Sequence, residues 1–365
     1  MIETNLLKKA VLLIGLIFLF YLSYFLKNFQ LFIISASFLI LFGFLIKRIN
    51  KNFIIFIFSI FFISSLIELT LFYLSNKSLK INDTKRISTN IKYIKTLLGY
   101  QPKEGIQKHQ IISNGNVIVD NKYTIGKDNY RVTPKIKDTT KNKTLNFFGG
   151  SYVFGWGLDD NETLPYLSQL YFKDWKIKNY GISGYGVHQM LSQIQNDKKK
   201  IKDINILITH KFHIPRSACK RDYSFGTPKY ILEKGKILRN GYCGYSFLGS
   251  IQLPRIIGSI INRSEIKKLI DKLYLKNNDF NDDDTRLYLS IILQIQKIIE
   301  KNDKLFVVGY IKDKENDVDR KILNELEINK IKVVDLSLDP NNKIYFLPDR
   351  HPSKIANEKR SILLW

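Results

Sequence analysis

The fold is decided by the stretch LNFFGGSYVFG at residues 145–155, in which a short apolar run meets a glycine-rich turn that carries a serine. Residues 145–148 have the composition of a buried strand, and Gly149-Gly150-Ser151 begins where that strand is expected to end. Similar apolar runs, each followed by a helix-like segment, recur along the rest of the chain. Strands that alternate with helices predict a parallel sheet covered by helices on both faces.

The expected elements extend from this stretch to the end of the chain. The predicted strands are 145–148, 175–179, 204–209, 305–310 and 332–336. The predicted helices are 163–172, 187–198, 286–300, 317–328 and 351–364, the last with Pro352 at its first helical position. An insertion at about 211–283 is expected to form a lid or a substrate-binding element. Residues 77–142 turn polar and are expected to form a linker and a small β appendage, with strand patterns at 116–119 and 123–132.

The composition is that of a folded, strongly basic chain. Its 365 residues contain 57 Lys and Arg against 33 Asp and Glu, a formal net charge of +24. Hydrophobic residues make up 45% and aromatic residues 13% of the chain, enough to build a core, which excludes intrinsic disorder. The basic residues are scattered, and the longest run, at 198–202, is interrupted by Ile201. Lys, Asn and Ile are abundant together, which indicates a compositional bias, and no nucleic-acid partner is predicted.

The chain has two cysteines, Cys219 and Cys243, both within the insertion. No C-x-x-C pair occurs, so the sequence predicts neither a structural metal site nor a redox motif. Two cysteines in one segment fit a single disulfide as well as they fit two separate thiols, and the sequence leaves this choice open.

Three apolar stretches, at about 10–26, 29–46 and 53–74, open the chain. Each is near the length of about 20 residues that a helix needs to span a bilayer core of about 30 Å, and a cleaved signal peptide would not be followed by two more. Residues 1–76 are therefore expected to form a three-helix membrane anchor in contact with the lipid bilayer. Basic residues near the span ends place the amino terminus inside and the large domain outside. Glu68, within the third stretch, is expected to reach the membrane interface.

Polar and glycine-rich segments follow the strand ends, where parallel sheets place their active sites. Ser151 follows the first strand, and a glycine-rich segment at 181–186 follows the second. His210 and His213 follow the third strand, and Asp349 and His351 follow the fifth. Acyl transfer through a serine needs a base that takes the hydroxyl proton, a carboxylate that orients the base, and N–H donors for the oxyanion. Because Asp349 and His351 share one short loop, both can reach the same rim as Ser151.

Other motifs fit this sequence less well. The serine follows the first strand, and G-x-S-x-V stands in place of the G-x-S-x-G elbow, which disfavours an α/β-hydrolase fold. Neither common phosphate-binding pattern, G-x-G-x-x-G or G-x-x-x-x-G-K-[ST], occurs at a strand–helix turn. Taken singly, Gly-Gly-Ser is also a common turn and Asp-x-His-Pro a common helix start. The prediction rests on their joint placement at the first and last strand ends.

Three segments resemble the sequence blocks of the SGNH (GDSL-type) hydrolases. FFGGSYVFG at 147–155, with DNETLPY at 160–166, resembles the first block, and more closely that of a membrane-tethered bacterial branch with a Gly-Gly-Ser variant. NYGISGYG at 179–186 resembles the second block, and DRHPS at 349–353 the last. The resemblance covers about residues 143–365. It implies a flavodoxin-like three-layer α/β/α sandwich and an activity in ester hydrolysis or acyl transfer.

The resemblance also implies a role for each side chain. Ser151 would be the nucleophile, His351 the general base and Asp349 the carboxylate that orients it, with the backbone amides of Ser151 and Gly184 as oxyanion donors. The chain departs from the family twice: Gly150 stands where the family has an aspartate, and the asparagine donor expected after the third strand is absent. His213 or His210 could replace that asparagine, or both could simply begin the insertion. This mechanism needs no metal and no other cofactor.

Together these features predict a membrane-anchored serine esterase or O-acyl(acetyl)transferase of the SGNH type. As an integral protein of the bacterial inner membrane with its catalytic domain outside the cytoplasm, it is expected to act on an acylated cell-envelope glycan. Acyl transfer, unlike hydrolysis, would need a membrane partner that supplies the acyl donor. Two alternatives stay open: a lipid esterase at the bilayer surface, and a catalytically inactive glycan-binding or assembly subunit.

Overall fold

The computed structural model describes residues 51–81, 86–89, 91–113, 116–135, 143–247, 251–253, 264–269, 280–312 and 316–365. The chain divides into two compact units. Residues 1–84 and 253–277 form the first unit, and residues 85–252 and 278–365 form the second. The second unit contains the strands that the sequence predicts for the sheet.

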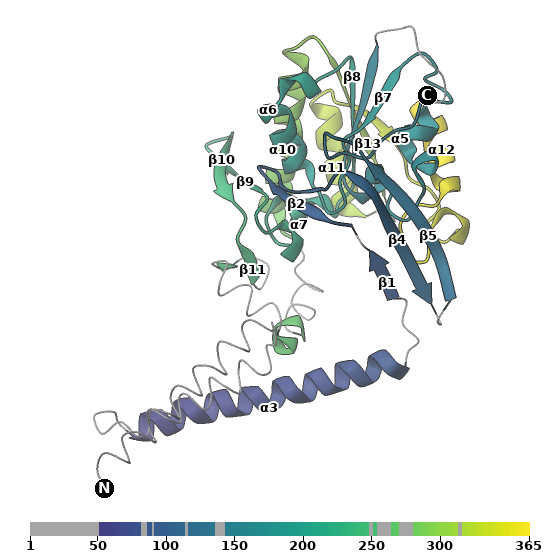
Figure 1. Ribbon diagram of the computed structural model, residues 1–365. Helices are drawn as coiled ribbons and strands as arrows, with labels where there is room; N and C mark the ends of the chain where they lie inside the picture. The colour runs from purple at the N-terminus through teal and green to yellow at the C-terminus, as the bar shows by residue number, and fades with distance from the viewer. Residues whose placement is uncertain are drawn as a thin grey trace. The chain divides into compact units, whose positions relative to one another are not determined.

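Five parallel strands form the central sheet of the second unit (Figure 1). They are β6 (Thr144–Phe148), β7 (Lys176–Asn179), β8 (Ile204–Thr209), β13 (Leu305–Tyr310) and β14 (Lys332–Asp335). The order β7-β6-β8-β13-β14 is the flavodoxin-like one, 2-1-3-4-5 when strands are counted along the chain. The inner strands β6, β8 and β13 are almost entirely buried, as their unbroken apolar runs require. The five predicted strands are confirmed, each within one residue at either end.

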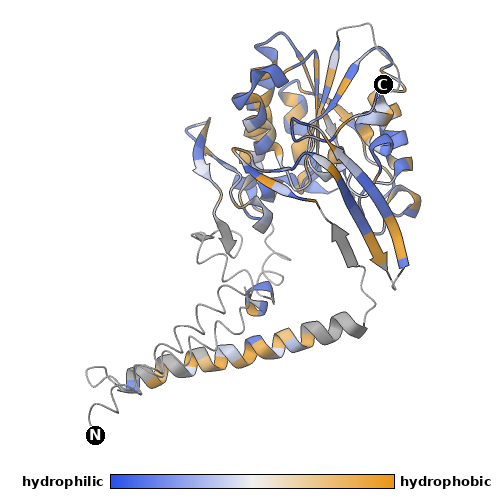
Figure 2. Ribbon diagram, in the orientation of Figure 1, coloured by the Kyte–Doolittle hydropathy of each residue, from blue (hydrophilic) through white to orange (hydrophobic). Residues whose placement is uncertain are grey.

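Helices cover both faces of this sheet and make it a three-layer sandwich. The cluster on one face includes residues of α6 (Val187–Asn196), α10 (Asp282–Glu300) and α11 (Asp317–Ile328), and the cluster on the other includes residues of α5 (Leu164–Ser168) and α12 (Lys354–Leu364). Hydrophobic residues gather where the sheet and its helices meet (Figure 2). On α10, Ile291, Ile292, Ile295 and Ile299 are fully buried. Each such side chain contributes roughly 1.5–3 kcal/mol to folding.

Capping residues set helix ends that hydrophobic periodicity does not fix. The hydroxyl of Ser353 accepts a hydrogen bond from the backbone of Ala356 at 3.2 Å, so α12 begins at Lys354 and Pro352 precedes the cap. Asn281 caps α10 in the same way, accepting from the backbone of Asp284 at 3.0 Å, and that helix begins four residues earlier than predicted.

Small antiparallel sheets surround the main one. β1 (Arg86–Thr89), β4 (Gly105–Ser113) and β5 (Asn116–Ile125) form a sheet in the order β1-β4-β5, and β2 (Tyr93–Thr96) pairs with β3 (Gly99–Pro102). The strand pattern expected at 123–132 stops at Ile125, because Gly126 donates a backbone hydrogen bond to Tyr130 and closes a turn.

The insertion begins with α7 (His213–Ser217) and continues into the hairpin of β9 (Pro228–Glu233) and β10 (Lys236–Tyr242), then into β11 (Tyr245–Phe247), which pairs with β12 (Ile251–Leu253). Cys219, just after α7, forms a disulfide with Cys243, just after β10. This answers the question that the sequence leaves open. The bond ties the end of α7 to the end of the hairpin.

The membrane prediction needs correction. No helix among the described residues is long and apolar enough to cross a membrane. The stretch 53–74 lies within α3 (Lys51–Ile81), where the hydroxyls of Ser59, Ser64 and Thr70 each donate to the carbonyl four residues earlier at 2.8 Å. The predicted three-helix anchor is therefore wrong there, and stretches 10–26 and 29–46 lie outside the described residues. The same finding overturns the prediction of an integral membrane protein with an extracytoplasmic catalytic domain.

Glu68 of α3 has a different role from the one expected at a membrane interface. Its carboxylate is fully buried and accepts hydrogen bonds from the Ser264 hydroxyl at 2.9 Å and from the backbone of Glu265 and Ile266 at 2.5 and 3.0 Å. These donors stand at the start of a helical turn at 265–269 in the same unit. A carboxylate at the start of a helix satisfies backbone N–H groups that have no partner within the helix.

Candidate active site

Ser151, His351 and Asp349 lie together beyond the carboxyl ends of the strands. Ser151 is the first residue of α4 (Ser151–Phe154), which two glycines separate from the end of β6, and its Oγ lies 3.0 Å from His351 Nε2. His351 Nδ1 lies 3.0 Å from Asp349 Oδ2, within ion-pair distance although not aligned as a hydrogen bond. Asp349 Oδ1 also accepts the backbone N–H of His351 at 3.2 Å. The structure thus brings together three predicted site residues that are up to 200 residues apart in the chain.

Asp349 is held by a contact that the sequence does not reveal. The indole Nε1 of Trp156 donates a hydrogen bond to Asp349 Oδ2 at 3.2 Å. Burial acts to raise the pKa of Asp349, but the contacts with His351 outweigh it and keep that pKa below its usual value. The carboxylate is therefore ionised at neutral pH and can orient the imidazole.

The loop after Ser151 is anchored by Arg131, which comes from the segment after β5. Its buried guanidinium donates to the backbone carbonyls of Phe154, Gly155 and Leu158 at 3.0, 2.6 and 2.6 Å, and it pairs with Asp160 at 2.8 Å. Burial lowers the pKa of Arg131, and Asp160 opposes that effect. The small β elements thus hold the serine loop in place.

Two backbone amides are the predicted oxyanion donors, those of Ser151 and Gly184. Within the described residues, no backbone hydrogen bond uses either amide. Gly184 has a φ of +86°, and a Cβ at this position would overlap the hydroxyl of Tyr100. Glycine is therefore required here both by the conformation and by the close approach of Tyr100.

His213 points toward the serine loop from α7. Its Nδ1 lies 2.9 Å from Thr209 Oγ1, which in turn lies 2.9 Å from the Tyr288 hydroxyl. Its Nε2 is buried without a hydrogen-bond partner and lies 3.1 Å from the place of a Cβ on Gly150. Burial lowers the pKa of His213 well below its usual value, so the ring is neutral at pH 7.

His210, the other histidine of this segment, has its own contacts. Its Nδ1 accepts the backbone N–H of Phe212 at 3.2 Å, and its ring stacks on Tyr152 at 5.3 Å between centroids. It contributes to the packing around the site, whereas His213 directs an unpartnered nitrogen at the serine loop.

The structure explains why glycine precedes Ser151. A Cβ on Gly150 would lie 2.9 Å from Arg216 Nη1 and 3.1 Å from His213 Nε2. The space that an aspartate side chain would need is therefore taken by two side chains of α7. Side chains of α7 therefore lie where the resemblance implies the side chain of an aspartate.

A cleft of about 610 Å³ opens beside Ser151 and His351. Its wall is mostly aromatic, and its lining residues are Tyr93, Tyr100, Ser151, Trp156, Ser183, Gly184, Arg216, Tyr223, Phe225 and His351. Sequence reasoning missed Trp156 and Arg216. Trp156 directly follows the glycine-rich stretch at 145–155, and this position is a sequence signal for a site residue. No local sequence pattern indicates Arg216.

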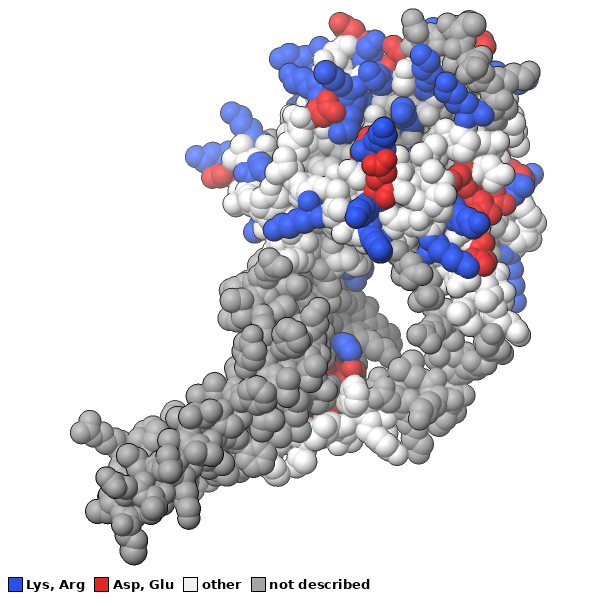
Figure 3. Space-filling view, in the orientation of Figure 1, with Lys and Arg blue, Asp and Glu red and all other residues white. Residues whose placement is uncertain are grey.

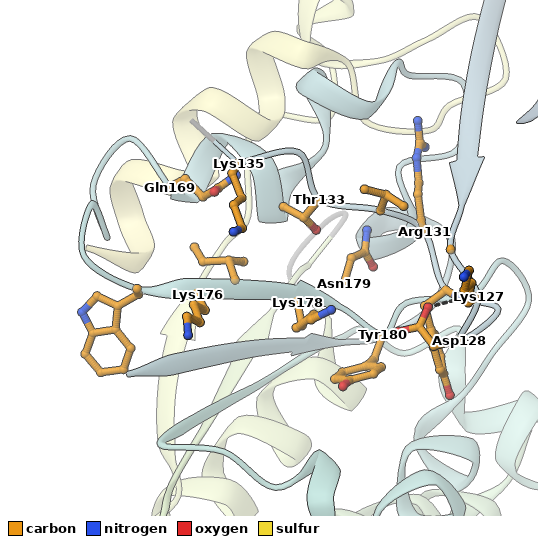
Figure 4. A pocket seen from close by; sticks show the side chains of 15 residues that line it. Lys127, Asp128, Arg131, Thr133, Lys135, Gln169, Lys176, Lys178, Asn179 and Tyr180 are labelled. Atoms are coloured by element: carbon orange, nitrogen blue, oxygen red, sulfur yellow. Dashed lines mark hydrogen bonds between the residues drawn. The ribbon is translucent and has the colours of Figure 1, made fainter. Parts of the chain in front are cut away.

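A second pocket, of about 410 Å³, lies along β7 and the segment 126–135. Figure 4 shows Lys135, Lys176 and Lys178 among its side chains, and no serine or histidine lines it. Basic side chains are also spread over the visible face of the second unit, with acidic ones among them (Figure 3). Among the described residues, no group of three His, Cys, Asp or Glu side chains could hold a metal ion.

No protein-family model matches the sequence, and no curated protein matches it. Solved structures do match. A member of the lipolytic G-D-S-L family from Veillonella parvula is 12% identical with a TM-score of 0.37, covering 60% of this chain and 95% of its own. An acetyl-xylooligosaccharide esterase from Geobacillus is 15% identical with a TM-score of 0.34, covering 63% and 94%. An acetyl xylan esterase from Butyrivibrio proteoclasticus is 10% identical with a TM-score of 0.36, covering 77% and 82%.

Proposed function

We propose that this protein is a serine esterase or acyltransferase that forms an acyl-enzyme on Ser151. The observation that carries the proposal is the 3.0 Å contact between Ser151 Oγ and His351 Nε2, with Asp349 on the other side of the imidazole. A serine hydroxyl becomes a useful nucleophile when a base takes its proton and a carboxylate fixes the tautomer of that base.

The reaction proceeds in two halves. Ser151 Oγ attacks the acyl carbon of an ester while His351 Nε2 takes its proton, and the tetrahedral intermediate collapses as His351 returns the proton to the departing alcohol oxygen. Water then repeats the sequence in reverse, with His351 as its base, and releases the acid. In acyl transfer, the hydroxyl of a second alcohol takes the place of water.

Three donors would stabilise the oxyanion: the backbone amides of Ser151 and Gly184, and Nε2–H of His213. A Thr209 hydroxyl that donates to Nδ1 of His213 leaves the ring proton on Nε2, where it faces the serine loop. A neutral histidine is a suitable donor because it adds no charge to the resting site. Each preorganised donor of this kind contributes about 10²–10³ to the rate.

The substrate in this proposal is an acylated carbohydrate. The cleft is open and its wall is rich in flat aromatic side chains, such as Tyr93, Trp156 and Tyr223, which offer apolar faces and polar edges to a sugar ring. Arg216 adds a charged group to this wall, which binding of a lipid acyl chain does not need.

A serine-directed fluorophosphonate probe tests the mechanism. The wild-type protein should be labelled, and Ser151→Ala and His351→Ala should lose the label. Ser183→Ala, which removes the other serine of the cleft, should keep it. Absence of wild-type labelling, or equal labelling of Ser151→Ala, would overturn the proposal and favour an inactive binding subunit.

A further inference from the structure

We infer that Arg216 binds a carboxylate of the substrate, so that the cleft selects esters of acidic carbohydrates. This inference rests on the proposed function and names the substrate class of the same site. Arg216 lies on α7 and lines the cleft together with Ser151 and Gly184. Its Nη1 approaches Gly150, the residue directly before the nucleophile.

The guanidinium is fixed in place by contacts that leave some of its donors unused. Nη1 donates to the carbonyl of Tyr185 at 2.8 Å, and Nε donates to the hydroxyl of Tyr223 at 3.2 Å. The charged group also lies 5.4 Å from the centre of the Tyr223 ring. A guanidinium has five N–H donors, so these two hydrogen bonds leave donors for a ligand. A preorganised arginine suits a carboxylate, which it can bind through two parallel hydrogen bonds.

In the part of the chain that the structure describes, no carboxylate forms an ion pair with this guanidinium. Among the described residues, no ion pair involves Arg216, and it is the only Lys, Arg, Asp or Glu side chain of the cleft lining. The carboxylate of Asp349 contacts Trp156 and His351 instead. A positive charge in an otherwise aromatic cleft attracts an anionic group and excludes cationic ones.

The aromatic wall places the rest of such a substrate. The rings of Tyr93 and Tyr100 pack edge to face at 5.4 Å, and the Tyr100 hydroxyl donates to the carbonyl of Ser183 at 2.9 Å. Burial raises the pKa of Tyr93 to about 12, so its hydroxyl stays neutral. A sugar ring can lie on this wall with its carboxylate toward Arg216 and its acyl ester toward Ser151.

Two matched substrates test this inference: mono-O-acetyl esters of methyl glucuronide, which carries a carboxylate, and of methyl glucoside, which does not. Wild-type kcat/KM should be higher for the acidic ester. Arg216→Gln should reduce this preference about 10- to 100-fold, mainly through KM for the acidic ester. Arg216→Lys should keep part of the preference, because it keeps the charge but loses the planar guanidinium that can bind both carboxylate oxygens.

Arg239→Gln is the matched control. It removes the same charge from β10, where Arg239 contacts the Ser192 hydroxyl and the Gly241 carbonyl away from the cleft lining, and it should keep the wild-type preference. If Arg216→Gln does not fold, inhibition of the wild type by methyl glucuronide and methyl glucoside gives the same comparison.

The failure of this inference differs from the failure of the proposed function. Equal kcat/KM for the two esters in the wild type, or an equal loss on both in Arg216→Gln, would overturn the role of Arg216 while leaving the esterase intact. Hydrolysis of neither ester, together with no fluorophosphonate labelling, would remove the proposed function itself.

Discussion

At the scale of single residues, the site depends on Trp156, whose side chain contacts the carboxylate of Asp349. Trp156 donates its indole N–H to Asp349 Oδ2, and its ring lies 6.0 Å from that of His351. The same ring packs against the ring of His109 at 4.6 Å between centroids, and this contact restricts the orientation of the indole. Trp156 is thus a positioning residue that acts on the base through Asp349.

Trp156→Phe keeps an aromatic side chain but removes the indole N–H donor. We expect kcat for an acetyl ester to fall about 3- to 10-fold, since one hydrogen bond contributes about 0.5–1.5 kcal/mol. Loss of the donor should also raise the pKa of Asp349, which would move the acid limb of the kcat/KM profile to higher pH. The measurement is the pH dependence of ester hydrolysis. Trp175→Phe is the control, because Trp175 packs on Phe172 outside the cleft, and it should leave the pH profile unchanged. An unchanged pH profile in Trp156→Phe would contradict the positioning role of Trp156.

At the scale of elements, the small β sheets support the serine loop. The hydroxyl of Tyr123 in β5 accepts the backbone N–H of Gly157 at 2.7 Å. Arg131 donates to three carbonyls of the same loop. The segment at 77–142, expected as a linker and an appendage, thus supplies part of the support of the site. The guanidinium of Arg131 also lies over the Tyr123 ring at 4.3 Å, which joins the two contacts.

Arg131→Met should therefore destabilise the protein strongly. The change removes the arginine donor of three loop carbonyls and the cation that pairs with Asp160, and breaking a buried ion pair costs about 3–5 kcal/mol. Arg320→Met removes an exposed pair with Asp317 and should cost less than about 1 kcal/mol. Urea unfolding of the two variants measures the difference. Similar losses in both would show that Arg131 does not anchor the loop.

At the scale of the whole molecule, stability should depend on buried neutral histidines. Burial, with Arg216 and Arg239 nearby, lowers the pKa of His188 from 6.5 to about 3. Between these values the unfolded chain binds a proton that the folded chain does not, so stability is lost as the pH falls below 6.5. At pH 4.5 the loss from this residue is about 2–3 kcal/mol.

Urea unfolding at pH 7 and pH 4.5 tests this expectation. His188→Gln should show a smaller decrease between the two pH values than the wild type does. Some decrease should remain, because burial also lowers the pKa values of His109, His210 and His213. An identical decrease in variant and wild type would contradict the role of His188.

The sequence predicts the sheet well and the stretch at 53–74 poorly, for physical reasons. Buried strands of a parallel sheet are unbroken apolar runs, so their bounds can be read from local composition. A run of similar hydropathy at 53–74 suggested a membrane span, but hydropathy cannot reveal that Glu68 finds buried partners at 264–266, almost 200 residues away. Glycines and polar residues at the strand ends indicated Ser151, Asp349 and His351. Arg131 and Arg216 escaped notice because their contacts are made only in the folded chain.

The filling of the space before Ser151 by two side chains of α7 restricts how this protein can change. Any larger residue at position 150 needs His213 and Arg216 to move first, and α7 is itself joined to the β9–β10 hairpin by the Cys219–Cys243 bond. A graft of a nucleophile loop with a bulkier residue at position 150 is therefore expected to require redesign of α7 at the same time.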